Sequence, residues 1–140
     1  MLIPSKTTFL LIALLAMSST SAKTCLDCIC DVASGCKNAP CNPKTGTCGY
    51  FQITLPYYED CGTPGRNGNE PVENAWKRCA ADKACSEKCV NAFVAKYSKN
   101  CPNKGACEKM ARLHDGGPTG CSKPATNDYW NKVKNCCKCT

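Results

Sequence analysis

The chain has 140 residues, sixteen of which are cysteine, and a formal net charge of +7 at pH 7. A domain of this size buries only about two-thirds of its unfolded surface, so covalent links between segments are useful. Sixteen cysteines allow eight disulfides, each typically contributing about 2–4 kcal/mol. The composition therefore predicts one disulfide-rich domain from an oxidising compartment and excludes an ordinary cytosolic protein.

The amino-terminal segment has the pattern of an export signal. Lys6 precedes an apolar stretch over 9–17, and small residues over 18–22 suit cleavage after Ala22. The apolar stretch is too short to cross a bilayer, and no later segment approaches that length. We therefore predict a signal peptide at residues 1–22 and a secreted, extracellular domain at residues 23–140 without a membrane span.

The cysteines also have an alternative interpretation as metal ligands. The groups at 25–30 and 136–139 have suitable spacing, and His114 is the one histidine that could join them. A secreted chain meets oxidant before it meets spare zinc, so we predict disulfides, no metal and no cofactor. The pairing cannot be read from the sequence. The predicted disulfide cysteines are Cys25, Cys28, Cys30, Cys36, Cys41, Cys48, Cys61, Cys79, Cys85, Cys89, Cys101, Cys107, Cys121, Cys136, Cys137 and Cys139.

The charge of the chain favours an anionic partner. Seventeen of the eighteen lysines and arginines, and all eleven acids, follow the predicted signal, which leaves a net charge near +6. The basic residues are scattered from Lys23 to Lys138 without a dense run, so we expect no nucleic-acid groove. A negatively charged bacterial envelope suits the charge and the compartment, and we expect a monomer.

Helical spacing begins close to the predicted cleavage site. Leu26, Ile29, Cys30 and Ala33 fall at i, i+3, i+4 and i+7, and Gly35 is a suitable C-terminal residue. The pattern predicts a first helix that ends near Gly35.

Turn-forming residues mark the middle of the chain. Prolines and glycines over 38–49 precede a strand-like run at 50–54, which predicts a hairpin or small sheet. Residues 62–71 have the composition of an exposed loop, and 115–120 that of a turn.

Apolar residues return to helical spacing after the loop, and Asp82 is a suitable N-cap for one of these segments. The later helical segments are 72–79, 85–97, 107–114 and 129–133. We therefore predict a small, disulfide-rich α+β domain that is mostly α, with up to five short helices and a small hairpin or sheet.

Seven short motifs follow one another along residues 23–140. They are CLDCIC, SGC, CGYFQI, YYEDCGTPG, AWKRC, RLHDGGPTGC and YWNKV. Their joint order and the cysteine spacing resemble the invertebrate-type lysozymes, also called the destabilase family, and the segment 57–79 is similar to nematode members. The resemblance implies a lysozyme-like domain that cleaves β-1,4 glycosidic bonds of bacterial peptidoglycan, in defence or in digestion of bacteria.

That reaction needs two carboxyl groups, one protonated and one ionised. In the family the acid is a glutamate directly before the Ser-Gly-Cys string, whereas Ala33 precedes that string here. The family's second carboxylate, an aspartate, falls in the stretch 41–48, which contains no acid and has Lys44 as the nearest equivalent. The resemblance thus implies that both catalytic carboxylates are replaced.

Four other acids could substitute, namely Asp27, Asp31, Asp60 and Asp115. The simpler interpretation is that they are exposed charges. Asp31 should also point to a different side of the first helix from Ala33.

The family is further credited with an isopeptidase activity that uses a serine and a lysine, with a histidine sometimes included. At the corresponding positions this chain has a gap or Thr47 and then Thr54, so only His114 remains. The resemblance therefore does not extend to that nucleophilic pair.

Positions that contact the sugar in the family are better kept, although Asp115 stands in place of the usual asparagine. We expect Tyr57 and Tyr58 to stack on sugar faces, or to be packed inside in at least one case. The expected substrate-binding residues are Thr54, Leu55, Pro56, Tyr57, Tyr58, Glu59, Tyr97, His114, Asp115 and Gly116.

The leading hypothesis is a secreted lysozyme homologue with an intact scaffold and a disabled site, which binds peptidoglycan or regulates its turnover. One alternative is an active lysozyme with a substitute carboxylate. The other is a cationic antimicrobial protein that needs no hydrolysis.

Overall fold

The computed structural model describes residues 21–140, so nearly all of the predicted signal peptide at 1–22 lies outside the described residues. Within 21–140 no helix combines the length and the apolar composition needed to cross a membrane.

Six α-helices and one two-stranded antiparallel sheet make up the regular structure of residues 21–140. In chain order these elements are α1 (Cys25–Ser34), β1 (Thr47–Cys48), β2 (Ile53–Thr54), α2 (Leu55–Asp60), α3 (Val72–Ala80), α4 (Lys83–Tyr97), α5 (Ala106–Gly116) and α6 (Asn127–Cys137). Short 3₁₀ helices lie at Ser98–Asn100, Gly117–Ser122 and Pro124–Thr126. The mostly helical α+β class predicted from the sequence is confirmed.

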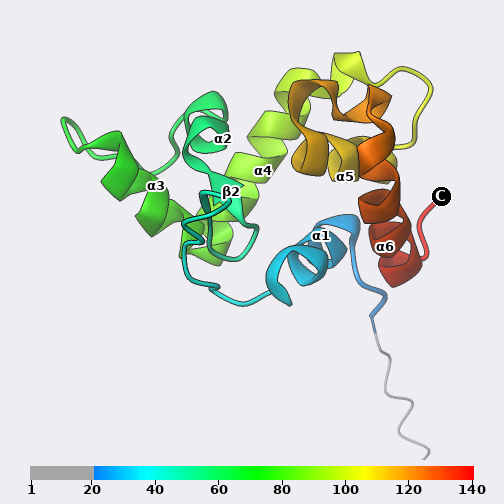
Figure 1. Ribbon diagram of the computed structural model, residues 1–140, viewed down its shortest axis with the longest axis horizontal. Coiled ribbons are helices and arrows are strands. Elements are labelled where there is room, and N and C mark those ends of the chain that lie inside the picture. Colours follow the sequence, from blue (N-terminus) through cyan, green and yellow to red (C-terminus); the bar gives the residue numbers. More distant parts are fainter. Residues whose placement is uncertain (1–20) are drawn as a thin grey trace, which may run out of the picture.

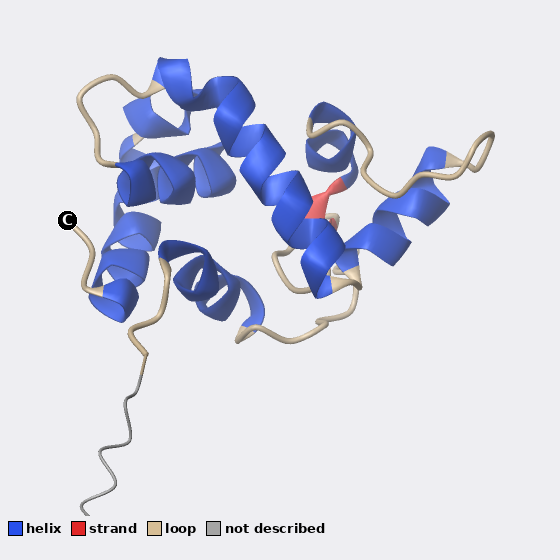
Figure 2. Cartoon of the chain, turned by 180° about the vertical axis from the view of Figure 1, so that it is seen from behind, coloured by secondary structure: helices blue, strands red, loops and turns tan. Residues whose placement is uncertain are grey.

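The elements form two lobes joined by one long helix (Figures 1 and 2). We call α1, α5 and α6 the helical lobe, and β1, β2, α2 and α3 the hairpin lobe. Helix α4 runs diagonally from the hairpin lobe to α5, and the C-terminus lies beside the helical lobe (Figure 1). The longest helix therefore sets the relative position of the two lobes.

Local signals explain α1, and the prediction for this helix is confirmed. The Thr24 hydroxyl accepts a hydrogen bond from the Asp27 backbone N–H at 3.1 Å, and the Asp27 carboxylate accepts one from the Thr24 N–H at 3.0 Å. This is a reciprocal capping box. Gly35 ends the helix with a φ of +70°, a left-handed conformation that glycine adopts without steric cost.

The predicted strand at 50–54 is only partly formed. Thr47 pairs with Thr54 and Cys48 with Ile53, after which Thr54 caps α2 by accepting a hydrogen bond from the Tyr57 N–H. The strand ends at Thr54 because Leu55 begins α2, and the Ile53 carbonyl accepts a hydrogen bond from the Trp76 indole N–H at 3.1 Å. The expectation of at most five helices is wrong, because α2 forms at Leu55–Asp60, a segment to which the sequence patterns assigned no element.

The later helices agree with their sequence patterns. The Asp82 carboxylate caps α4 by accepting a hydrogen bond from the Cys85 N–H at 2.7 Å. The predicted turn at 115–120 is wrong: α5 continues through Asp115 and Gly116, and a 3₁₀ helix begins at Gly117. The loop at 62–71 contains no helix or strand, as predicted.

All sixteen cysteines are paired, which confirms the disulfide prediction. The pairs are Cys25–Cys107, Cys28–Cys136, Cys30–Cys36, Cys41–Cys48, Cys61–Cys89, Cys79–Cys85, Cys101–Cys121 and Cys137–Cys139. The first two fasten α1 to α5 and to α6. The sulfur atoms that the metal alternative would need are all in S–S bonds.

Candidate functional site

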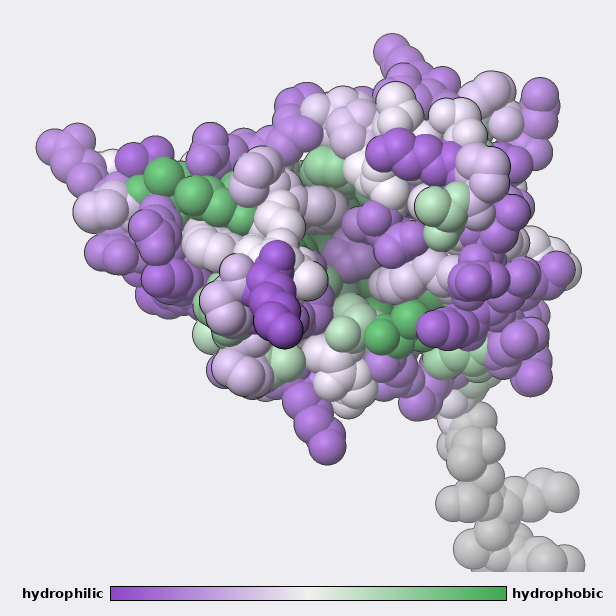
Figure 3. Space-filling model, viewed as in Figure 1, coloured by the Kyte–Doolittle hydropathy of each residue, from purple (hydrophilic) through white to green (hydrophobic). Residues whose placement is uncertain are grey.

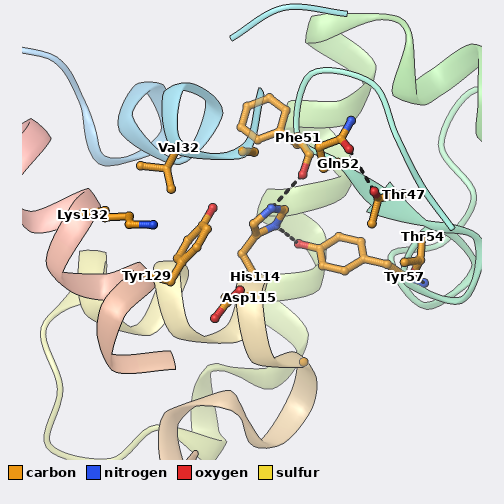
Figure 4. Close-up of a pocket in the computed structure, with 12 residues that line it drawn as sticks. Val32, Thr47, Phe51, Gln52, Thr54, Tyr57, His114, Asp115, Tyr129 and Lys132 are labelled. Atoms are coloured by element: carbon orange, nitrogen blue, oxygen red, sulfur yellow. Dashed lines mark hydrogen bonds between the residues drawn. The ribbon is translucent and has the colours of Figure 1, made fainter. Parts of the chain in front are cut away.

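One pocket of about 450 Å³ lies between the two lobes. Figure 3 shows a hollow near the middle of this face, within a mostly hydrophilic surface, and Figure 4 shows the side chains around it. Its volume is in the range of small-molecule sites. The lining residues are Val32, Ala33, Thr47, Phe51, Gln52, Thr54, Tyr57, His114, Asp115, Gly117, Tyr129 and Lys132.

The hairpin side of the pocket, which we call the hairpin wall, is made of Thr47, Phe51, Gln52, Thr54 and Tyr57. None of these side chains carries a charge at neutral pH. The Gln52 amide accepts a hydrogen bond from the Thr47 hydroxyl at 2.9 Å and donates one to the Gly49 carbonyl at 2.7 Å. The polar groups of this wall therefore hold one another in place.

His114 reaches from α5 across to the hairpin wall (Figure 4). Its Nε2 lies 2.9 Å from the Phe51 carbonyl oxygen, and its Nδ1 lies 3.1 Å from the Tyr57 hydroxyl. Because a carbonyl can only accept, Nε2 carries the proton, and Nδ1 accepts from Tyr57 in the neutral ring.

The environment of His114 keeps the ring neutral. Burial lowers its pKa to about 4, against the opposing effect of the hydrogen bond to Phe51. Both ring nitrogens are already engaged at neutral pH. His114 thus connects the two walls and has no free lone pair with which to act as a base.

The two tyrosines expected to meet sugar have different surroundings. Tyr57 lines the pocket, but its ring stacks on Phe93 with centroids 3.9 Å apart, and its hydroxyl is used by His114. Tyr58 is fully buried and donates its hydroxyl to the Pro64 carbonyl at 2.8 Å. Tyr57 is a rigid part of the wall, whereas Tyr58 is packed inside and does not reach the pocket.

The opposite side of the pocket, which we call the helical wall, carries both charges among the lining residues. Ala33 comes from α1, Asp115 from α5, and Tyr129 and Lys132 from successive turns of α6. Burial raises the pKa of the Asp115 carboxyl, while the charge of Lys132 lowers it. The groups that could act on a ligand electrostatically are therefore on this wall.

Four of the ten expected substrate-binding residues line the pocket: Thr54, Tyr57, His114 and Asp115. The other six do not line it. They are Leu55, Pro56, Tyr58, Glu59, Tyr97 and Gly116.

Ala33 and Lys44, which occupy the family's catalytic positions by resemblance, are not brought together at the pocket. Ala33 lines it. Lys44 lies in the exposed turn at 42–46, where its backbone N–H donates to the Asn42 side chain at 2.9 Å.

Three of the four candidate substitute acids do not line the pocket and form other interactions. Asp27 belongs to the capping box of α1, and Asp31 pairs with Lys23 at 2.5 Å. The Asp60 carboxylate accepts hydrogen bonds from the Lys96 ammonium and the Tyr97 hydroxyl. Asp115 is the one acid that lines the pocket.

Sequence reasoning did not assign seven of the pocket residues to a binding site. They are Val32, Thr47, Phe51, Gln52, Gly117, Tyr129 and Lys132. Tyr129 and Lys132 are three apart in the YWNKV motif and so share one face of α6, a spacing that could have placed them together.

The comparisons with known proteins are consistent over nearly the whole described chain. The family model described as Destabilase matches residues 22–136. Invertebrate-type lysozyme 3 of Caenorhabditis elegans is 51% identical over 120 residues, which are 83% of this chain and 86% of that protein. A lysozyme of the bivalve Meretrix lusoria is 42% identical over 122 residues, covering 84% of this chain and 92% of that protein.

Solved structures of similar proteins have the same fold. Meretrix lusoria lysozyme in complex with Aeromonas hydrophila PliI gives a TM-score of 0.70 at 41% identity, covering 83% of this chain and 93% of that chain. Tapes japonica lysozyme gives a TM-score of 0.70 at 40% identity, covering 81% and 90%.

Proposed function

The chain belongs to the destabilase family of invertebrate-type lysozymes, and from this premise we propose that its pocket binds the glycan of bacterial peptidoglycan without hydrolysing it. The protein would act outside the cell, as a binding or regulatory protein in defence or bacterial digestion. The predicted export signal and the eight disulfides support that location.

A single observation carries this proposal: Ala33 lines the pocket. The family resemblance assigns the general acid to this position. A methyl group cannot donate a proton to the leaving oxygen. Loss of a positioned general acid typically costs about 10²–10⁴-fold in rate. The resemblance assigns the second carboxylate to the stretch at 41–48, where Lys44 lies outside the pocket and no acid is available to stabilise the sugar cation.

The remainder of the pocket supports binding. Its hairpin wall is held by internal hydrogen bonds, and His114 fixes that wall to α5. A preformed pocket loses little conformational freedom when a ligand enters. Loss of the two carboxylates therefore leaves the shape of the site intact.

A second candidate function is hydrolysis with Asp115 as the substitute acid. Burial raises the pKa of its carboxyl, as a general acid requires. Against this, the pocket offers no second carboxylate to stabilise the sugar cation. This candidate predicts release of reducing ends that disappears in Asp115→Asn.

The cationic antimicrobial alternative uses net charge rather than the pocket. It predicts bacterial killing that persists after the disulfides are reduced and alkylated and that decreases as salt is raised. This alternative would be excluded if the disulfide-bonded protein binds peptidoglycan but the reduced and alkylated protein does not kill bacteria.

The test is sedimentation with insoluble peptidoglycan and turbidity clearance, with the disulfide-bonded chain and an Ala33→Glu, Lys44→Asp double variant. We expect the natural chain to sediment without clearing and the double variant to gain clearance. Ala92→Glu, at an exposed position on α4 outside the pocket, is the matched control and should gain none. Clearance by the natural chain, or failure to sediment, would contradict the proposal.

A further inference from the structure

The charges of the helical wall indicate which glycan the pocket prefers. We propose that the end of the pocket beside α6 binds a carboxylate of the glycan through the Lys132 ammonium, so that the preferred ligand is a carboxylate-bearing saccharide rather than a neutral one. In peptidoglycan this group is a lactyl or stem-peptide carboxylate. The inference rests on the proposed glycan binding and adds the class of sugar.

Lys132 is the one cation among the lining residues and has no carboxylate partner in residues 21–140. It forms none of the ion pairs found within 4.0 Å in that range, and residues 1–20 contain no acid. Figure 4 shows its side chain beside Tyr129 at the edge of the pocket. The ammonium is therefore available to an incoming anion.

Ala33 cannot carry a charge that would repel such an anion. Ala33 contributes a methyl group to the pocket where the family resemblance places a glutamate. Two like charges a few ångströms apart repel even when solvent screens them, so a carboxylate is better tolerated beside Ala33 than beside an ionised glutamate.

The hairpin wall offers no competing charge. Its polar side chains are neutral, and those of Thr47 and Gln52 are bonded to each other. A neutral sugar face suits this wall, whereas a charged substituent is directed to the helical wall, where Lys132 lies. The asymmetry thus predicts an orientation of the ligand as well as a preference.

Asp115 should weaken the binding of an acidic saccharide, whereas Lys132 should strengthen it. Its carboxylate lies on the same wall and would repel an anionic ligand, while Lys132 attracts it. Asp115→Asn should therefore tighten binding of an acidic saccharide and leave a neutral one unchanged. A pair of opposite effects from neighbouring positions on one wall is not expected of a purely structural disturbance.

The experiment is calorimetric titration with two tetrasaccharides of alternating N-acetylglucosamine and N-acetylmuramic acid. One has free carboxylates, and in the other they are amidated, which keeps the shape and removes the charge. At low salt we expect the acid form to bind about fivefold more tightly, with the difference shrinking as salt is raised. Lys132→Gln should abolish the difference, whereas Lys134→Gln, exposed on α6 outside the pocket, should keep it.

The outcomes separate the inference from the proposal on which it rests. Equal binding of the two saccharides by the natural chain, or equal effects of Lys132→Gln and Lys134→Gln, would overturn the role of Lys132 and leave glycan binding standing. No binding of either saccharide would overturn the proposed function itself.

Discussion

The hairpin wall and the helical wall face each other across one pocket, yet they differ in chemistry. On the hairpin wall the side chains of Thr47 and Gln52 are hydrogen-bonded to each other, and the Tyr57 hydroxyl is hydrogen-bonded to His114. This wall therefore determines the shape of the pocket. The helical wall has both charges, together with Ala33. The difference teaches that the shape of the hairpin wall and the charges of the pocket come from separate segments.

The close packing of the hairpin wall gives the largest expected effect. A Cβ at Gly49 would lie 1.8 Å from the Ala80 carbonyl oxygen, and the residue has a φ of +75°. Gly49→Ala should therefore destabilise the protein by about 4 kcal/mol, as overpacking and left-handed strain add. Chemical denaturation with the disulfides intact measures this loss.

Gly46 provides the matched control in the same hairpin. Its φ is +68°, but no atom lies within 4 Å of the position of a Cβ. Gly46→Ala should cost only about 1 kcal/mol, from backbone strain alone. If the two variants lose equal stability, the close approach of Gly49 to α3 does not contribute to the stability of this hairpin.

The connection between the walls should depend on pH through His114. Its pKa is lowered to about 4 in the folded protein, from the usual 6.5. The folded protein therefore binds this proton less readily than the unfolded chain does. The contribution of His114 to the free energy of unfolding is fully present above pH 6.5 and decreases as the pH falls from 6.5 to about 4. The loss should reach up to about 3 kcal/mol, measured by denaturation at several pH values.

His114→Gln is the comparison for that pH profile and should lose most of the slope between pH 6.5 and 4.5. Glu70 does not interfere in this window, because the hydrogen bond from Arg78 lowers its pKa to about 2 and its contribution decreases only below pH 4.5. An unchanged slope in His114→Gln would mean that other groups carry the pH dependence.

The hydroxyl groups of the two walls provide the smallest contrast. Tyr57→Phe removes the donor to His114 Nδ1 and leaves that acceptor without its partner, which should cost about 1–2 kcal/mol. Tyr129→Phe removes only a long contact of 3.5 Å to the Ile29 carbonyl and should cost less than about 0.5 kcal/mol. Thermal or chemical denaturation of both variants tests which one loses more stability. A larger loss in Tyr129→Phe would contradict the stronger role given to the Tyr57 hydroxyl.

The sequence predicted those parts of the fold that local signals determine. Gly35 ends α1 and Asp82 caps α4, as their positions beside the helical spacing predicted. Helix α2 is an exception, because its start is also local: the Thr54 hydroxyl accepts a hydrogen bond from the Tyr57 N–H, and Pro56 lies in the first turn. It was missed because a helix of six residues is too short to show a helical spacing of apolar residues.

The pocket was predicted only where the motifs of the family indicated it. Ala33, Thr54, Tyr57, His114 and Asp115 were found in this way. Lys132 was missed because its place depends on how α6 docks against α1. That docking is fastened by Cys28–Cys136, whose residues are 108 apart, and such a pairing cannot be deduced from spacing.

The most direct test is the release of reducing ends by natural protein that has first been shown to sediment with peptidoglycan. We predict bound protein and no release above the background of an Asp115→Asn variant. Reducing ends released by the bound natural chain and lost in Asp115→Asn would contradict the separation of binding from catalysis, and would show that the helical wall still hydrolyses the glycan.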